Sequence, residues 1–234
     1  MIPFPEEPPR SRRVEVAPGA VHLPDWLAPE EQRRLVLACR EWARGPVPMR
    51  RTRLPSGGTM SVQSVHLGWH WRPYRYSRTA DDQNGARVAE LPEWLADLGR
   101  RVVADAYQDP EAARAYRPDV ALVNYYDRDA RLGMHQDKEE RSADPVVSLS
   151  IGDRCVFRLG NAEHRNRPWH DVELASGDAF VFGGPARLAY HGVPKLYPDS
   201  GPPDTGLTSG RLNLTMRVTG LGGTGQGDAG LADE

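Results

Sequence analysis

The chain has 234 residues, 39% of them hydrophobic, and a formal net charge of −2 at pH 7. This length suits one sizeable domain, while two distant cysteines, Cys39 and Cys155, exclude a disulfide framework and indicate reduced, buried thiols. No run of 18 apolar residues occurs, which excludes a membrane-spanning helix, and residues 1–13 lack the apolar segment of a secretory signal. We therefore expect a monomeric protein of the cytoplasm.

Two helices are predicted in the N-terminal half, after a disordered tail at residues 1–13 that is rich in proline and charge. The first runs from about Pro29 to Trp42, because proline suits the first helical turn, apolar residues recur at helical spacing and Gly45 lies beyond its end. The second starts at Pro92 and carries one apolar stripe, formed by Leu95, Leu98, Val102 and Ala106. Both patterns are typical of helices that pack against a sheet.

Positive charge is concentrated between these helices. Residues 41–80 contain seven arginines and one acidic residue, Glu41, in a chain whose net charge is slightly negative. A local excess of this kind is typical of a surface that binds phosphate groups. A solvated arginine-rich loop explains the same composition equally well, so the segment alone does not decide between the two.

The pattern changes at about Val120, where short segments follow one another and are separated by glycine-containing turns. They are VALVNYY, RLGMHQD, VVSLSI, CVFRLG, HDVELA, DAFVFG, LAYHGV and RLNLTMRV. About eight strands after a helical part predict a mainly β protein with supporting helices (α+β), in which the strands form a double-stranded β-helix, or jelly roll. Residues 219–234 are glycine-rich, acidic and aperiodic, and are predicted to be a second disordered tail.

One of these segments contains two candidate metal ligands. His135 and Asp137 are two residues apart, so on a strand they point to the same side, and Gly133 leaves room beside them. Alone, His-x-Asp is a weak signal in a chain with seven histidines. His191 adds a third ligand if the jelly roll returns it opposite the first two; otherwise it is an ordinary core histidine. Two histidines and one carboxylate are the facial ligand set of non-haem iron(II) oxygenases.

The last strand segment, RLNLTMR at residues 211–217, alternates polar and apolar residues. In the simplest interpretation its polar side faces water. A facial metal site changes this, because such oxygenases commonly use 2-oxoglutarate, whose far carboxylate suits the planar fork of arginine. Arg211 and Arg217 share one face but lie roughly 20 Å apart at the strand rise, so one would hold the far carboxylate while the other works near the metal. Neutral hydrogen bonds to the same ligand would come from two residues on one face of VALVNYY, Asn124 and Tyr126.

At these residues the chain resembles the AlkB family of iron(II)- and 2-oxoglutarate-dependent alkylation-repair dioxygenases. The resemblance covers most of residues 14–218, which we expect to form a single domain with its jelly-roll core at about 120–218. The matching motifs are NYY, MHQDK, YHGV, GD followed by FVFGG, and RLNLTMR. The resemblance implies iron(II) held by His135, Asp137 and His191. It also implies 2-oxoglutarate held by Asn124, Tyr126, Arg211, Asn213 and Arg217, with Arg217 serving catalysis as well.

The resemblance continues upstream, where TMSV at residues 59–62 and HLGW at 66–69 are similar to the family's nucleotide-recognition lid. We name residues 45–80 the lid segment. The resemblance implies that Trp69 stacks on a base flipped out of the nucleic acid, with the ring of His135 on the other side. Further contacts to the base or its strand are implied for Tyr74, Tyr76, Glu139 and Arg165.

Two departures from the family concern the choice of substrate. Glu139 stands where the bacterial repair members carry aspartate, and the extra methylene alters how a carboxylate reaches an exocyclic amino group. The lid segment is also slightly shorter around HWRPY. Each implied substrate residue has an ordinary structural interpretation too, since Trp69 can be a core residue, the tyrosines packing residues and Arg165 a solvated one.

The function implied by the resemblance is oxidative demethylation of N-alkylated bases, such as 1-methyladenine and 3-methylcytosine, in DNA, with RNA as a further candidate. The reaction would consume O₂ and 2-oxoglutarate and release formaldehyde, succinate and CO₂. Two alternatives stay open: an oxygenase of the same kind acting on a protein or a small molecule, and a non-catalytic jelly-roll binding module. The basic lid segment argues against the first, and two inward-facing arginines argue against the second.

Overall fold

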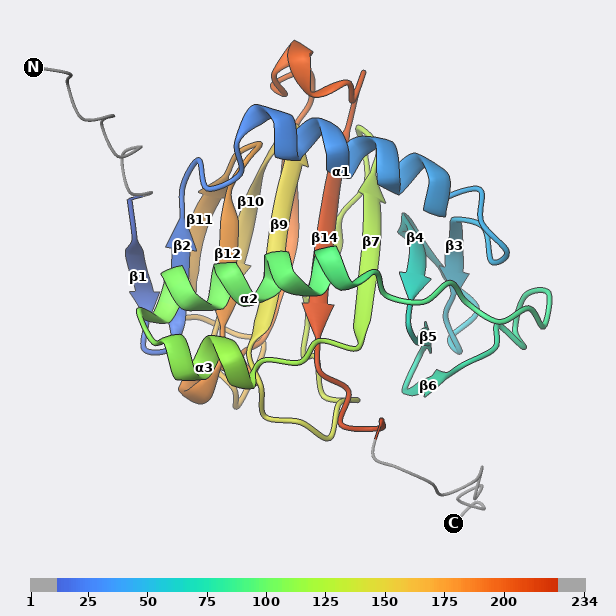
Figure 1. Ribbon diagram of the computed structural model, residues 1–234, viewed down its shortest axis with the longest axis horizontal. Coiled ribbons are helices and arrows are strands. Elements are labelled where there is room, and N and C mark those ends of the chain that lie inside the picture. Colours follow the sequence, from blue (N-terminus) through green and yellow to red (C-terminus); the bar gives the residue numbers. More distant parts are fainter. Residues whose placement is uncertain (1–11, 223–234) are drawn as a thin grey trace, which may run out of the picture.

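Residues 12–222, which the computed structural model describes, form two facing β-sheets with helices on one side (Figure 1). The larger sheet has eight strands, in the order β1 (Val14–Ala17), β2 (Ala20–Leu23), β12 (Ala179–Phe182), β9 (Val146–Gly152), β14 (Arg211–Arg217), β7 (Val120–Tyr126), β4 (Thr59–Leu67) and β3 (Arg50–Arg53). The smaller sheet has four, in the order β11 (His170–Leu174), β10 (Arg154–Leu159), β13 (His191–Tyr197) and β8 (Leu132–His135). This is the predicted jelly roll.

The predicted helices cover the outer face of the larger sheet (Figure 1). Helix α1 spans Pro29–Trp42, as predicted, and α2 spans Glu93–Tyr107, one residue after the predicted proline. A third, short helix, α3 (Pro110–Ala115), was not predicted; Asp109 caps it by accepting hydrogen bonds from two backbone N–H groups of its first turn. Two single 3₁₀ turns, η1 (Gly184–Ala186) and η2 (Pro203–Thr205), complete the described helical structure.

All eight strand segments predicted after Val120 are present as β7 to β14. The sequence analysis did not predict strands β1 to β4, which widen the larger sheet at both edges. Strand β4 pairs with β7 and carries β3 beside it, and the hairpin of β5 (His70–Arg72) and β6 (Arg75–Ser77) follows. The lid segment therefore supplies the last two strands of the larger sheet, β4 and β3, and continues from β4 into this hairpin (Figure 1).

Strand β14 is buried on both faces, and this decides the interpretation of its alternating pattern. Its apolar residues Leu212, Leu214 and Met216 belong to the core between the larger sheet and the helices. The opposite face, which bears Arg211 and Arg217, points between the two sheets and is buried as well. The interpretation in which this polar face is wet is therefore wrong, and its charged groups must find partners inside the protein.

Most of the two predicted tails, at residues 1–11 and 223–234, lies outside the described residues. Thr219, where the second tail was predicted to begin, is buried, and its hydroxyl donates a hydrogen bond to Asp119 at 2.6 Å. Among residues 12–222 no helix is long and apolar enough to cross a membrane.

A sharp turn at Gly68 sets the direction of the chain from β4 into the lid hairpin. Gly68 has φ of +77°, and a Cβ there would lie 2.0 Å from the backbone oxygen of Asp119. The turn also brings the Trp69 indole N–H within 3.0 Å of the Asp119 carboxylate, to which it donates. Only glycine combines this backbone conformation with this close approach.

We expect Gly68→Ala to destabilise the protein by more than about 2 kcal/mol, because left-handed backbone strain adds to a clash with rigid backbone. Thermal unfolding monitored by circular dichroism measures the loss. Gly58→Ala is the matched control in the same segment, since a Cβ there meets nothing closer than the Ser56 hydroxyl at 3.9 Å. Equal melting temperatures for the two variants would show that the turn tolerates a side chain.

Candidate metal and cosubstrate site

A cavity of about 580 Å³ opens between the two sheets and extends to the lid segment. The three predicted metal ligands line it from the smaller sheet, since His135 ends β8, Asp137 follows it and His191 begins β13. The larger sheet contributes the whole polar face of β14, together with two residues of the neighbouring strand β7: Arg211, Asn213, Thr215, Arg217, Asn124 and Tyr126. The fold thus brings together all the residues predicted to bind metal and cosubstrate.

The three candidate ligands converge on one point. Antiparallel pairing of β13 with β8 sets His191 directly opposite His135. The Nε2 atoms of these two histidines lie 3.6 Å (His135) and 3.5 Å (His191) from oxygens of Asp137. One ligand atom from each residue lies within 4.8 Å of the others, so a single ion can contact all three.

Backbone carbonyls orient both imidazoles. The Nδ1 atom of His135 lies 2.9 Å from the oxygen of Gly133, and that of His191 lies 3.0 Å from the oxygen of Ala189. A carbonyl oxygen only accepts, so each Nδ1 carries a hydrogen, and Nε2, on the side of Asp137, is the nitrogen left to bind a metal ion. This arrangement, with one ring nitrogen bound to the protein and the other free, is the usual state of a metal-ligating histidine.

The protonation states also suit a cation. Burial alone would raise the pKa of Asp137, but the positive charge of Arg217, with smaller contributions from both histidines, holds it at about 2. Burial, followed by the neighbouring His135, lowers the pKa of His191 to about 4. Near neutral pH the site therefore holds a carboxylate and a neutral imidazole, both of which can coordinate a metal ion.

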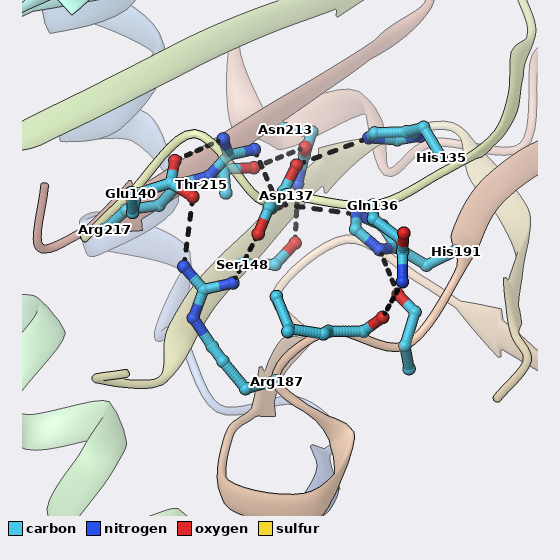
Figure 2. Close-up of polar contacts among 12 residues, drawn as sticks. His135, Gln136, Asp137, Glu140, Ser148, Arg187, His191, Asn213, Thr215 and Arg217 are labelled. Carbon is cyan, nitrogen blue, oxygen red and sulfur yellow. Dashed lines mark hydrogen bonds and ion pairs between the residues drawn. The ribbon is translucent and has the colours of Figure 1, made fainter. Parts of the chain in front are cut away.

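Arg217 lies against the metal site from the larger sheet (Figure 2). Its Nη2 atom is 2.7 Å from Oδ2 of Asp137, an ion pair without an aligned hydrogen bond. The same guanidinium donates from Nη1 to Glu140 at 3.0 Å. Arg187, which follows η1, donates to the backbone oxygen of Asp137 and to Glu140. Sequence reasoning missed Glu140 and Arg187, because neither lies in a periodic pattern or a recognisable motif.

At the other end of β14, Arg211 is a buried cation that lacks an anionic partner among the described residues. Its side chain is almost fully buried, and its one hydrogen bond goes from Nη2 to the hydroxyl of Ser150 at 2.9 Å. Its Nε and Nη1 atoms have no partner within residues 12–222. A guanidinium in this state requires an anion, and a carboxylate offers two oxygens in matching geometry. The site therefore fits the far carboxylate of a dicarboxylic acid.

Between the two arginines, neutral polar groups follow the strand. Asn213 donates to the hydroxyl of Ser148 at 2.7 Å and accepts from the hydroxyl of Thr215 at 3.0 Å. Asn124 lies directly across from Asn213 in the sheet, and Tyr126 across from Arg211. The two serines, at positions 148 and 150 of VVSLSI, could have been recognised in the sequence by their period of two on the strand beside β14.

The residues predicted to contact the substrate fall into two groups. Glu139, Arg165 and Tyr74 line the cavity, and Tyr74 is 73% exposed. Burial, together with the negative charges of Glu140 and Asp137, raises the pKa of Glu139. Tyr76 does not line the cavity, because its hydroxyl donates to Glu140.

Trp69 also lies outside the cavity wall. Its indole donates to Asp119, and the Arg78 guanidinium lies 3.7 Å from its ring centroid. The tryptophan that lines the cavity is Trp71 on β5, whose ring packs edge-on against that of His66. To stack on a base held in this cavity, Trp69 would have to move toward it. Trp71 was not considered in the sequence analysis, although HLGWHW contains both indoles.

His66 is a further cavity residue that the sequence analysis did not single out. The backbone N–H of Trp71 donates to its Nδ1 atom at 3.1 Å, so the remaining hydrogen of the neutral ring sits on Nε2. Burial lowers the pKa of His66 well below its usual value, which keeps the ring neutral. The Nε2 atom of His66 and the indole nitrogen of Trp71 are buried and have no partner within residues 12–222.

A jelly roll that holds two histidines and a carboxylate beside an inward-facing arginine strand defines the class of non-haem iron oxygenases. Comparisons with known proteins agree. Residues 19–217 match the family model of the 2OG-Fe(II) oxygenase superfamily. The chain is 38% identical over 213 residues to the alpha-ketoglutarate-dependent dioxygenase AlkB homolog of Caulobacter vibrioides, which covers 88% of this chain and 90% of that protein.

A longer Arabidopsis protein and a solved structure are similar as well. The chain is 32% identical over 222 residues to the DNA N(6)-methyladenine demethylase ALKBH1D of Arabidopsis thaliana, and the match covers 86% of this chain but spans only 50% of that relative. The solved structure of OsALKBH1 superimposes with a TM-score of 0.78 at 30% identity, covering 88% of this chain and 99% of that one. The chain therefore belongs to the AlkB family of the 2OG-Fe(II) oxygenase superfamily.

Iron(II) and 2-oxoglutarate are the cofactor and cosubstrate of this superfamily, and the donor set fits both. Two imidazoles and one carboxylate suit iron(II). The guanidinium of Arg211, two of whose nitrogens have no partner within residues 12–222, suits the far carboxylate of 2-oxoglutarate. The predicted cofactors and the predicted recognition of the family are confirmed.

We expect Asp137→Ala to abolish binding of a divalent metal while the protein stays folded, because the site loses its anionic ligand and Glu140 still compensates Arg217. Isothermal titration with cobalt(II) as the probe measures the affinity, and far-ultraviolet circular dichroism checks the fold. Asp129→Ala, at an exposed position before β8, is the control and should bind like the wild type. Wild-type affinity in Asp137→Ala would place the metal elsewhere.

We expect Arg211→Met to weaken binding of 2-oxoglutarate by about 2–5 kcal/mol, because a charge-assisted contact to a buried carboxylate is lost. The protein without cosubstrate should keep or gain thermal stability, since a buried cation without an anion has been removed. A surface arginine would show neither effect. Titration with 2-oxoglutarate and a melting curve on the same preparation test both expectations, and unchanged affinity would exclude Arg211 as the carboxylate partner.

Proposed function

We propose that the protein oxidatively removes N-linked methyl groups from bases in DNA, with 1-methyladenine and 3-methylcytosine as the first substrates to test and RNA as a further candidate. One observation supports this most directly: a single cavity joins the metal ligands and the Arg211 guanidinium to the lid segment. Cosubstrate and a nucleobase can therefore meet at one metal ion. The Arabidopsis relative named above carries DNA demethylase in its name, which agrees with a nucleobase as substrate.

Strand β14 lines the part of the cavity that would bind the cosubstrate. Arg211 pairs with the far carboxylate of 2-oxoglutarate, and Tyr126 and Asn124 line the same end of the cavity. Arg217 holds Asp137 in place beside the keto-acid end. When bound, iron(II) couples the decarboxylation of 2-oxoglutarate to the activation of O₂. The methyl group is thereby hydroxylated, and the resulting N-hydroxymethyl base releases formaldehyde and leaves an N–H group.

The base end lies under the lid segment. Trp71 offers an aromatic face within the cavity, and the ring of His135 lies in the same cavity beside the metal. Glu139 can accept a hydrogen bond from an exocyclic amino group, while Nε2–H of His66 can donate to a ring nitrogen or an exocyclic oxygen. The sequence prediction gave the stacking role to Trp69. We propose Trp71 instead, because Trp69 is already engaged by Asp119 and Arg78.

The nucleic-acid strand is proposed to follow the lid segment and the loop before β11. Four lid arginines form no ion pair with the described residues. Arg78 contacts the Gly68 oxygen and the Trp69 ring, and the other three are available to meet phosphate groups: Arg53, Arg72 and Arg75. Arg165 lines the cavity mouth from the opposite side. Tyr74 stands exposed between them and offers a ring on which an unpaired neighbouring base can stack. We propose that the protein does this as a monomer.

The proposal is tested by mass spectrometry of oligonucleotides that carry one methylated base, incubated with iron(II) and with or without 2-oxoglutarate. Single-stranded and duplex DNA and RNA, each with 1-methyladenine, 3-methylcytosine or N6-methyladenine, cover the candidate substrates. We expect mass loss of one methyl group in at least one DNA oligonucleotide, dependent on 2-oxoglutarate. Succinate formation with no change in any oligonucleotide would favour the alternative of a protein or small-molecule substrate.

We expect Trp71→Ala to weaken binding of a methylated oligonucleotide by about 1–3 kcal/mol, the usual contribution of one base–aromatic stack, with metal and 2-oxoglutarate affinities unchanged. Trp69→Ala should instead lower the melting temperature, because it removes the hydrogen bond to Asp119 and the contact with Arg78. Fluorescence anisotropy and thermal unfolding on both variants compare the two roles. The reverse pattern would return the stacking role to Trp69.

A further inference from the structure

We infer that Glu140 is a positioning residue, which keeps the metal ligand Asp137 in place through two arginines. Through Tyr76, Glu140 also connects the position of Asp137 to the lid segment. The inference about the metal stands on the site alone, whereas the inference about the lid rests on the proposed function. Figure 2 shows the two arginines reaching toward Asp137 and Glu140 from different elements.

Glu140 is the common acceptor of this cluster. Its side chain is 0% exposed, and its two carboxylate oxygens contact different arginines. Oε2 accepts from Nη2 of Arg187 at 3.1 Å. Oε1 accepts from Nη1 of Arg217 at 3.0 Å and from the hydroxyl of Tyr76. A fully buried carboxylate is costly unless paired, so these three donors are what keeps it there.

The two arginines hold Asp137 at two different points. Arg217 is 2.7 Å from the carboxylate oxygen Oδ2, whereas Arg187 donates to the backbone oxygen at 2.7 Å. Arg187 also donates from Nε to the backbone oxygen of Asp144 at 2.8 Å. It therefore fastens both ends of the loop that runs from the metal ligand to the region before β9. Side chain and backbone of Asp137 are both fixed by groups that Glu140 orients.

Charge gives Glu140 a second effect on the metal. Asp137 and Glu140 together balance the two buried guanidinium groups of Arg187 and Arg217. Without the Glu140 charge, the cluster beside the metal carries one excess positive charge, which opposes a divalent cation. Loss of Glu140 should thus weaken metal binding, both because Asp137 is less well positioned and because the local charge becomes more positive.

The lid enters through Tyr76. This residue lies on β6 of the lid hairpin, and its hydroxyl donates to Glu140 and lies 3.3 Å from Nη1 of Arg217. If the hairpin shifts when a nucleic-acid strand binds, the shift therefore also moves the groups that position Asp137. The neighbouring acid, Glu139, differs, since it lines the cavity and forms no ion pair with the described residues.

The metal part is tested with cobalt(II) as the probe, in the absence of cosubstrate and nucleic acid. We expect Glu140→Gln to bind cobalt(II) about 10–100-fold more weakly than the wild type and to change its visible absorption bands, as partners that orient metal ligands usually do. Glu140→Asp, which keeps the charge, should recover part of the affinity. Glu163→Gln, at an exposed position outside the cavity, is the control and should keep affinity and spectrum. Wild-type affinity and spectrum in Glu140→Gln would overturn the inference.

A second variant keeps the test decisive if Glu140→Gln does not fold. Arg187→Lys retains the positive charge but cannot span Glu140 and both backbone oxygens, so its cobalt(II) spectrum should change while its melting temperature shows a folded protein. An unchanged spectrum in this variant would show that the Asp137 backbone needs no such clamp, and would likewise overturn the inference.

The lid part uses a single-stranded methylated oligonucleotide added to the cobalt(II) protein. We expect the oligonucleotide to shift the absorption bands of the wild type, and Tyr76→Phe to bind cobalt(II) within about twofold of the wild type but to lose that shift. A shift that persists in Tyr76→Phe, or its absence in a wild-type protein that binds the oligonucleotide by anisotropy, would overturn the coupling. Failure of the oligonucleotide to bind at all would count against the proposed function and against the coupling to the lid. The cobalt(II) measurements on the Glu140 variants would still test whether Glu140 positions Asp137.

Discussion

The ion pair between Asp137 and Arg217 joins the two sheets at the point where the chemistry is placed. Asp137 follows a strand of the smaller sheet and Arg217 ends the central strand of the larger one, and 2.7 Å separates their charged atoms. Burying either charge in this interior without a partner would be costly. The metal ligand, the cosubstrate strand and the lid contact through Glu140 all depend on this pairing, because each of them is arranged around one of its two partners.

Much of the fold could be predicted because its signals are local and periodic. Short segments separated by glycine-containing turns marked the strands after Val120, and helical spacing marked α1 and α2. Strands β1 to β4, of which β1 and β3 form the edges of the sheet, lacked so clear a signal, and α3 is too short to show a stripe. Predicting that β14 is buried on both faces needed a further step. A strand face that carries arginines is expected in the interior only when a metal and a dicarboxylic acid are expected beside it.

The candidate site was predictable where residues lie in one motif and unpredictable where partners come from distant segments. His135, Asp137 and Arg211 belong to motifs whose spacing carries a meaning. Arg187 is 47 residues from Glu140, and no pattern links them before the chain folds. Which of Trp69 and Trp71 lines the cavity depends on the turn at Gly68, whose positive φ and close backbone contact cannot be read from the spacing of residues.

The uncompensated charge of Arg211 has a consequence for the protein outside catalysis. Because this cation is buried without an anion among the described residues, the polypeptide alone is not the most stable form of the molecule. A dicarboxylate completes the interior as a counter-ion, and its binding to the folded state alone adds stability that grows with the logarithm of its concentration. The cellular lifetime of this chain would then follow the supply of a central metabolite, so that abundance and activity rise and fall together.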